Sequence, residues 1–312
     1  MSLLEVKNLH TYFDTRRGVV KAVNGISFEV QEGRTLGIVG ESGSGKSQTA
    51  MSILKLFENN QRIADGEIFF EGKRINDLSD KDLQDIRGNE ISMIFQEPMS
   101  SLNPVFTVER QLNEVLMLHQ DLNKKEATQK SLEMLRSVKI TNPEAVIKQY
   151  PHQLSGGMRQ RVMIAMALAC NPKLLIADEP TTALDVIIQA EILKLMNDLK
   201  EDFNTSIMFI THDLGVISQM ADDVIVMHRG KIVESGSILS IFDRATHPYT
   251  KRLMAAFLKT DISRRKGEKE TEQDLFSAEN DVFDFKNFRE NNEADGDWHE
   301  VGPNHFVACR LK

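Results

Sequence analysis

The feature that most constrains this sequence is a glycine-rich loop at residues 40–47, Gly-Glu-Ser-Gly-Ser-Gly-Lys-Ser. It fits the pattern G-x-x-x-x-G-K-[ST] and follows the apolar segment 36–39, which predicts a buried strand before the loop and a helix after it. In such loops the glycines let successive backbone N–H groups face phosphate oxygens, and the helix N-terminus adds partial positive charge. The lysine can reach the outer phosphates, and the last serine can bind Mg²⁺. The loop therefore predicts a nucleoside triphosphate ligand.

A second apolar segment, residues 174–177, ends in two acidic residues, Asp178 and Glu179. Its length and composition are typical of a central parallel strand with both faces covered. In a phosphoryl-transfer site, Asp178 would hold the Mg²⁺ shell and Glu179 would polarise the attacking water. The alternative is an acid pair that caps a helix or forms salt bridges, but the glycine-rich loop favours the catalytic interpretation.

Further motifs accompany these two segments. In sequence order they are Gln96, Leu154-Ser155-Gly156-Gly157, Ala183-Leu184-Asp185 and His212. Each motif alone is modest evidence, but the full set in this order is highly specific. It resembles the nucleotide-binding subunit of ATP-binding cassette (ABC) transporters, which hydrolyses ATP.

The resemblance implies a role for each motif. Gln96 would be the Q-loop glutamine, residues 154–158 the signature loop, residues 183–185 the D-loop and His212 the switch histidine. Met158 departs from the commoner glutamine at its place, whereas the serine and glycines before it are intact. The resemblance implies three catalytic residues, Glu179, His212 and Gln96, and three metal ligands, Ser47, Gln96 and Asp178. The implied nucleotide-binding residues are Phe13, Gly40, Ser42, Gly43, Ser44, Gly45, Lys46, Ser47, Gln48, Ser155, Gly156, Gly157 and Asp185.

The signature loop leads into a segment rich in alanine and methionine, residues 158–165, which predicts a second helix N-terminus and so a second anion site. One triphosphate cannot easily occupy two such sites far apart in one domain. The resemblance resolves this, because in the family two ATPase domains pair head to tail and each ATP lies between the phosphate loop of one and the signature loop of the other. The alternative is that Ser155 only caps an ordinary helix.

Two aromatic positions have open alternatives. Phe13 stands where related domains place a ring that stacks on adenine, but alternation along a strand cannot separate a stacking ring from a packed one. His212 ends an apolar segment, where a neutral imidazole could hydrogen-bond the γ-phosphate. The alternative for His212 is a core histidine with satisfied hydrogen bonds.

The order of patterns predicts an α/β fold. Residues 1 to about 95 are strand-rich, with a short strand expected at 67–70, and residues 97–160 change to helical periodicity. The resemblance implies a P-loop NTPase (RecA-like) core with an antiparallel β subdomain and an inserted helical subdomain at about 97–160. These form an ATPase domain at 1–258. A partly mobile C-terminal extension, 259–312, follows it.

Four segments resemble, nearly word for word, the ATPase subunits of oligopeptide, dipeptide and nickel importers: residues 96–104, 154–161, 180–186 and 247–250. The partners implied are a second homologous ATPase in a heterodimer, two transmembrane permeases and an extracellular substrate-binding protein. The alternatives are a nickel or other small-solute importer and a soluble ABC ATPase outside transport. A subunit that does not hydrolyse ATP would lack Glu179 or the signature glycines, and both are present.

The end of the chain, residues 298–309, resembles the close of the extension in this family. Many members carry three further cysteines there and are thought to bind an iron–sulfur cluster, but this chain has only Cys309 in that region. One thiolate cannot hold a cluster that four normally bind. The predicted ligands are therefore ATP and Mg²⁺ without an iron–sulfur cluster, and Cys309 would be a relic or a packing residue.

Composition limits the remaining classes. The net charge of −8 leaves no broad basic surface, which disfavours a nucleic-acid partner. The longest apolar run, 162–170, is too short to span a bilayer, and the N-terminus shows no signal-peptide pattern. We therefore expect a protein at the cytoplasmic side of the membrane, held there by its partner subunits.

Overall fold

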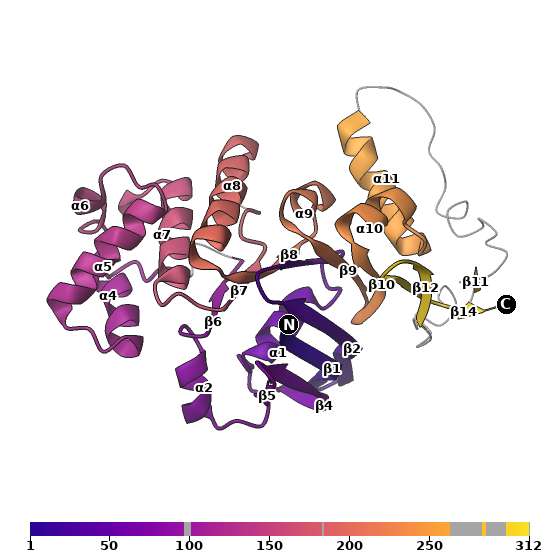
Figure 1. Ribbon diagram of the computed structural model, residues 1–312. Helices are drawn as coiled ribbons and strands as arrows, with labels where there is room; N and C mark the ends of the chain where they lie inside the picture. Colours follow the sequence, from indigo (N-terminus) through magenta and orange to yellow (C-terminus); the bar gives the residue numbers. More distant parts are fainter. Residues whose placement is uncertain (97–100, 183, 263–282, 285–297, 312) are drawn as a thin grey trace. The chain divides into compact units, whose positions relative to one another are not determined.

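The chain folds into two compact units in the computed structural model, which describes residues 1–96, 101–182, 184–262, 283–284 and 298–311 (Figure 1). The first unit comprises Met1–Leu3, Val30–Thr35 and Phe70–Ile210, and the second comprises Leu4–Glu29, Leu36–Phe69 and Thr211–Lys312.

Three parallel strands form the centre of the first unit. β7 (Leu174–Asp178) pairs with β6 (Ile91–Ile94) on one side and with β8 (Ser206–Thr211) on the other. Every residue of β7 and β8 is buried. Because helices cover both faces of a parallel sheet, these strands consist of continuous rather than alternating apolar residues.

Apart from one short helix that precedes it, the helices of the first unit lie within and after the segment whose helical periodicity the sequence indicated. α4 (Val108–His119), α5 (Lys124–Ser137) and α7 (Gly156–Leu168) pack against one another, and α6 (Pro143–Val146) packs on α5 (Figure 1). The unit also contains α2 (Asp80–Ile86), α8 (Val186–Phe203), a 3₁₀ turn at Pro151–Gln153 and the short strand β5 (Lys73–Arg74). Across the described ranges, no helix is both long and apolar enough to cross a membrane.

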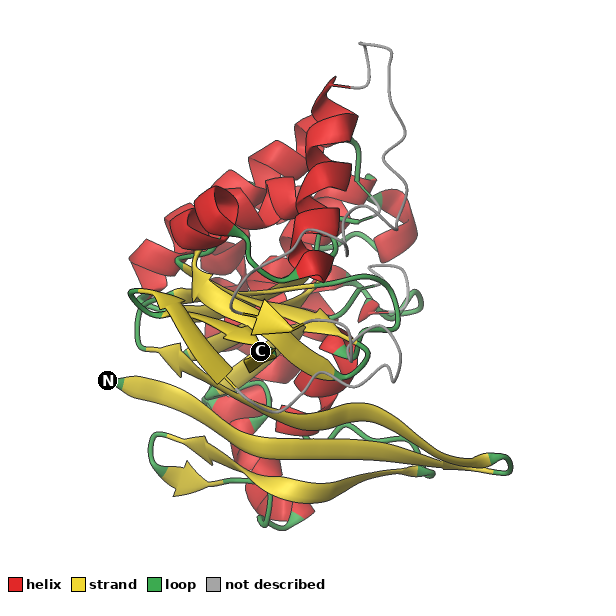
Figure 2. Cartoon of the chain, turned by 90° about the vertical axis from the view of Figure 1, so that its right-hand side faces the viewer, coloured by secondary structure: helices red, strands yellow, loops and turns green. Residues whose placement is uncertain are grey.

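Long strands make up most of the N-terminal part of the second unit. β1 (Ser2–Thr15) and β2 (Gly18–Gln31) form a long hairpin, and β4 (Gln61–Phe70) lies on the other side of β1 (Figure 2). β4 is longer than the strand expected at 67–70. It passes through Gly66, which has φ +103° and where a Cβ would lie 2.5 Å from the Asn8 carbonyl oxygen. The backbones of β4 and β1 therefore approach too closely at this position for a side chain.

A second group of strands in this unit carries the phosphate loop. β3 (Thr35–Val39) pairs in parallel with β9 (Asp223–His228), which pairs antiparallel with β10 (Lys231–Ser237). The helices here are α1 (Lys46–Ile53), α9 (Leu214–Met220), α10 (Ile238–Arg244) and α11 (Pro248–Ile262).

The end of the C-terminal extension continues this sheet. β13 (His305–Ala308) pairs antiparallel with β10, and β12 (Trp298–Gly302) pairs with β13; β11 (Phe283–Asp284) pairs with β14 (Arg310–Leu311). The domain boundary placed at residue 258 falls inside α11 and stays a prediction, as does mobility of the extension. Residues 263–282 and 285–297, on which most of that prediction depends, lie outside the described residues. Cys309 is buried, 3% exposed, beside β13.

A buried histidine caps α11. The His247 ring accepts, at Nδ1, a hydrogen bond of 3.1 Å from the Tyr249 N–H, and the residue is fully buried. Burial, with smaller effects from His228 and Lys251, lowers the pKa of His247 to about 3. The ring is therefore neutral in the folded chain at physiological pH, as an accepting nitrogen requires.

Folding should consequently become less favourable in mild acid. Because the pKa of His247 is lower in the folded state, the unfolded state binds more protons below about pH 6.5, and stability falls as the pH is lowered. At pH 5 we expect this residue alone to lower the free energy of unfolding by about 2 kcal/mol relative to pH 7.5. His247→Asn keeps an accepting side chain that does not titrate.

The measurement is the free energy of unfolding from urea titrations at pH 7.5 and pH 5. The difference between the two pH values should be smaller in His247→Asn than in the wild type by that amount. His152→Asn, which changes an exposed histidine, should keep the wild-type difference. Equal pH differences in wild type and His247→Asn would show that His247 is not held neutral by burial.

Candidate functional site

The phosphate loop joins β3 to α1 in the second unit, as the sequence predicted for this segment. Gly45 precedes α1 with φ +103°, and a Cβ there would lie 2.5 Å from the Ala22 carbonyl oxygen. At Gly40 a Cβ would lie 2.2 Å from the carbonyl oxygen of Met227. Both positions therefore require glycine, one for its backbone angle as well as for space.

Lys46 lies inside this loop. Its side chain is buried, and its Nζ donates to the carbonyl oxygens of Gly40 at 2.8 Å and Glu41 at 3.1 Å. The ammonium is thus held by the backbone of the loop itself, where a phosphate oxygen could take up a charge-assisted hydrogen bond. Ser47 is half-buried in the first turn of α1. Gln48 accepts a 2.7 Å hydrogen bond from the Gln61 side chain.

The other predicted residues of the second unit are Phe13 and His212. Phe13 lies on β1 with an intermediate exposure, which leaves both stacking and packing open. His212 follows β8 and is exposed, so the alternative of a buried core histidine does not apply. Its neighbour Asp213 caps α9 by accepting from the Gly215 and Val216 N–H groups.

The acidic pair lies at the end of β7 in the first unit. Asp178 is 3% exposed and Glu179 is 8% exposed. Glu179 has φ +46°, a conformation that non-glycine residues rarely adopt and that commonly marks functional positions. Its N–H donates to the Ile210 carbonyl oxygen at 2.9 Å, which holds the strained turn on β8.

Two side chains orient the Glu179 carboxylate. Its Oε2 accepts from Gln96 Nε2 at 3.2 Å and from Thr182 Oγ1 at 2.9 Å. The structure therefore brings together Gln96 and Glu179, which are far apart in sequence and which the motifs had predicted separately. Thr182 was missed as a site residue; its place three residues after Glu179, in Pro-Thr-Thr, was the available signal.

The signature loop forms the N-terminus of α7. Ser155 caps the helix by accepting from the Met158 N–H at 3.3 Å, so the capping interpretation holds whether or not the loop also binds phosphate. Ser155 and Gly156 are exposed. A Cβ on Gly156 would come no closer than 3.9 Å to Leu184, whereas one on Gly157 would lie 3.0 Å from Ile188. The loop is thus open at Gly156 and tight at Gly157.

The structure describes only part of the predicted D-loop, residues 183–185. Ala183 lies outside the described residues. Asp185 is exposed and caps α8, accepting from the Ile188 N–H at 3.0 Å. After it, Val186 and Ile187 are 82% and 74% exposed, which is unusual for two consecutive branched apolar side chains.

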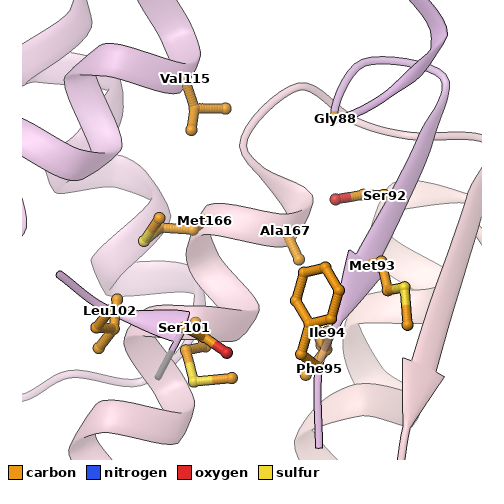
Figure 3. Close-up of a pocket in the computed structure, with 11 residues that line it drawn as sticks. Gly88, Ser92, Met93, Ile94, Phe95, Ser101, Leu102, Val115, Met166 and Ala167 are labelled. Atoms are coloured by element: carbon orange, nitrogen blue, oxygen red, sulfur yellow. The ribbon is translucent and has the colours of Figure 1, made fainter. Parts of the chain in front are cut away.

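An apolar pocket of about 180 Å³ lies in the first unit, and Phe95 is one of the residues that line it. Its walls come from β6 and the following residue Phe95, from α4 and from α7 (Figure 3). Methionine side chains contribute to two of these walls, Met93 from β6 and Met166 from α7. Phe95 directly precedes Gln96, so a group bound in the pocket would lie next to the residue that holds Glu179.

Comparison with known families gives the wider context of these motifs. The sequence profile described as "ABC transporter" matches residues 23–182, which contain the phosphate loop, Gln96, the signature loop and the acidic pair. The chain belongs to the ABC transporter family. This confirms the family recognised from the motifs.

Curated relatives match this ABC family chain over most of its length. The oligopeptide transport ATP-binding protein AppD of Bacillus subtilis (strain 168) is 54% identical over 256 residues, which cover 82% of this chain and 78% of AppD. The dipeptide transport ATP-binding protein DppD of Lactococcus lactis subsp. cremoris (strain MG1363) is 46% identical over 316 residues, which cover 99% of this chain and 90% of DppD.

Solved structures agree with the fold of this ABC ATPase. A dimeric post-hydrolysis structure of the ATP-binding cassette MJ0796, bound to ADP and Pi, matches with a TM-score of 0.68 and 29% identity, and covers 75% of this chain and 98% of that chain. The predicted α/β P-loop NTPase fold is therefore confirmed. The roles of individual site residues stay predictions.

Proposed function

We propose that this chain is the ATP-hydrolysing subunit of an ABC importer for oligopeptides or dipeptides. The observation that carries the proposal is the 54% identity to an oligopeptide transport ATP-binding protein over 82% of the chain. The phosphate loop, with Lys46 at its centre, binds the triphosphate through its N–H groups and the lysine ammonium.

Glu179 acts as the general base for the water that attacks the γ-phosphate. Gln96 and Thr182 both donate to its Oε2, which holds the carboxylate in a fixed orientation for the water. The exposed ring of His212 follows β8, and it hydrogen-bonds the γ-phosphate in this proposal.

The residues proposed to hold Mg²⁺ fit that ion chemically. Ser47, Gln96 and Asp178 offer a hydroxyl, an amide carbonyl and a carboxylate, and Mg²⁺ prefers oxygen ligands. Gln96 uses its amide nitrogen for Glu179, which leaves its carbonyl oxygen as a ligand. When bound, Mg²⁺ would neutralise the charge that develops on the phosphate oxygens during transfer.

The signature loop serves a second ATPase subunit. Ser155 and Gly156 are exposed at the N-terminus of α7, where phosphate can approach from outside the chain. The dimeric ADP-bound cassette supports pairing of two such subunits. We propose a heterodimer with a second homologous ATPase, bound on the cytoplasmic side of the membrane to two permease subunits that receive substrate from an extracellular binding protein.

The apolar pocket beside Phe95 is the proposed permease contact. Methionine side chains adapt to irregular partners, and Phe95 of the pocket wall directly precedes Gln96, which donates to Glu179. A permease segment seated there would therefore sense the position of the catalytic glutamate through Gln96.

The proposal is tested with Lys46→Ala. Loss of a buried ammonium that faces the phosphates should weaken ATP binding by at least about tenfold, because charged hydrogen bonds contribute about 1.5–3 kcal/mol. Isothermal titration with ATP measures this in the purified chain, with Lys125→Ala on the exposed face of α5 as the control. Unchanged affinity in Lys46→Ala would contradict the assigned site.

Transport is measured with the same variants in vesicles that contain the assembled complex. Uptake of labelled di- and oligopeptides should require ATP and should be lost in Lys46→Ala but kept in Lys125→Ala. Uptake of nickel in place of peptides would identify the alternative substrate class. A chain that neither joins a permease complex nor supports any uptake would contradict the importer assignment.

A further inference from the structure

The first turn of α11 contacts the phosphate loop directly. Tyr249 is 1% exposed, and its Oη accepts a hydrogen bond of 2.8 Å from the N–H of Glu41, the second residue of the loop. The ring packs against His228 at the end of β9, with ring centroids 4.0 Å apart. Tyr249 therefore reaches the loop from a rigid, buried position.

The same helix also contacts the side chain of Glu41. Arg252 Nη2 lies 2.7 Å from Glu41 Oε1, and the Arg252 guanidinium lies 5.3 Å from the centre of the Tyr249 ring. A carboxylate in a loop that binds a triphosphate adds like charge close to the ligand. Pairing with Arg252 offsets that charge. Both side chains are partly exposed, so solvent screens part of the effect.

The loop backbone at Glu41 is thus held from two directions. Tyr249 accepts from its N–H, while Lys46 donates to its carbonyl oxygen. The two contacts use different atoms of Glu41, so Lys46 can turn to a phosphate without breaking the Tyr249 contact. Tyr249 therefore restricts the empty loop to the backbone arrangement that the bound loop also uses, so that less order has to be gained when ATP binds.

Buried polar contacts fix the start of α11. Glu234 on β10 is fully buried and accepts from the N–H groups of Thr246 at 2.7 Å and His247 at 3.0 Å. On β13, His305 is 1% exposed, and its Nε2 lies 2.7 Å from Glu234 Oε1. A carboxylate satisfied by several partners has one arrangement, so the turn before Tyr249 is rigid.

We propose that Tyr249 and Arg252 are positioning residues for the phosphate loop and that they set its affinity for the nucleotide. This inference rests on the proposed function, in which that loop binds ATP. Tyr249 holds the Glu41 amide, and so keeps the loop backbone in the arrangement that binds phosphate. Arg252 reduces the repulsion between the Glu41 carboxylate and the bound phosphates. Neither residue touches the reacting atoms.

The first experiment titrates the full chain with ATP after Tyr249→Phe. This change removes only the accepting oxygen and should weaken ATP binding about fivefold, the value of one ordinary hydrogen bond. The thermal unfolding midpoint without nucleotide should change little, because the ring and its packing on His228 remain. In the assembled ATPase the KM for ATP should rise while kcat stays near wild type. Tyr150→Phe, on a ring that is 39% exposed, is the matched control.

The second experiment is a double-mutant cycle, which separates charge compensation from folding. Arg252→Ala should weaken ATP binding about two- to threefold at low salt, and the loss should shrink at high salt. Glu41→Gln should bind ATP at least as tightly as wild type. In Glu41→Gln, the further change Arg252→Ala should have no effect, because the charge that Arg252 offsets is absent.

The outcomes distinguish this inference from the proposed function. If wild type binds ATP and Lys46→Ala does not, but Tyr249→Phe binds as wild type does, the positioning role is wrong and the ATP site stands. An Arg252→Ala effect that persists unchanged in Glu41→Gln overturns the charge compensation. If wild type itself does not bind ATP, the proposed function fails first. Should Tyr249→Phe unfold, the double-mutant cycle of Glu41 and Arg252 still tests whether α11 affects ATP binding through the phosphate loop.

Discussion

Replacing Glu179 with glutamine should stop ATP hydrolysis while ATP remains bound. The amide keeps the shape of the carboxylate, and its oxygen can still accept from Gln96 and Thr182. It cannot accept a proton, however, so the attacking water loses its base. Removal of a general base typically lowers turnover by about 10²- to 10⁴-fold. Nucleotide should therefore accumulate in a closed dimer of ATPase subunits.

Phosphate release by the assembled complex measures the turnover, and a nucleotide titration of the same variant measures binding. Glu201→Gln, an exposed glutamate near the end of α8, serves as the control for the loss of one carboxylate. Turnover of Glu179→Gln near the wild-type rate would mean that another group is the base. Loss of ATP binding in this variant would instead indicate that Glu179 supports the fold of the site.

Introducing aspartate at Gly156 should block transport without harming the chain that carries the change. A Cβ at this position would lie 3.9 Å from the Leu184 side chain, an ordinary van der Waals distance, so the helix should fold normally. If the signature loop serves the partner's ATP, the new carboxylate faces the γ-phosphate. Two unit charges about 4 Å apart at an effective dielectric constant of about 20 repel by about 4 kcal/mol. Closure of the dimer should therefore be lost.

The matched control is Gly156→Asn, which has nearly the same shape without the charge. ATP binding to the isolated Gly156→Asp subunit should be near normal, whereas dimer closure and uptake by the assembled complex should be lost. Gly156→Asn should retain more dimer closure and more uptake than Gly156→Asp. A Gly156→Asp subunit that lost its own nucleotide affinity, yet still formed the closed complex, would place the signature loop against ATP of its own chain and overturn the head-to-tail arrangement.

The sequence by itself determined the parts of the molecule that depend on short segments. The phosphate loop could be predicted because glycine at 45 and lysine at 46 encode a left-handed turn followed by a helix start. Ser155 predicted the first turn of α7 for a similar local reason, since its hydroxyl caps the helix three residues later. The continuous apolar residues of β7 likewise predicted a strand covered on both faces.

Only the tertiary structure decided how distant segments support these motifs. The positive φ of Glu179 and its hydrogen bond to Gln96 depend on how β6 and β7 pair, which no local pattern encodes. Tyr249 reaches Glu41 across 208 residues of sequence, a contact that no local pattern around either residue encodes. The addition of β13 to β10 was likewise hidden in a charged extension. Local propensity follows from the residues of one segment, whereas such contacts follow from the path of the whole chain.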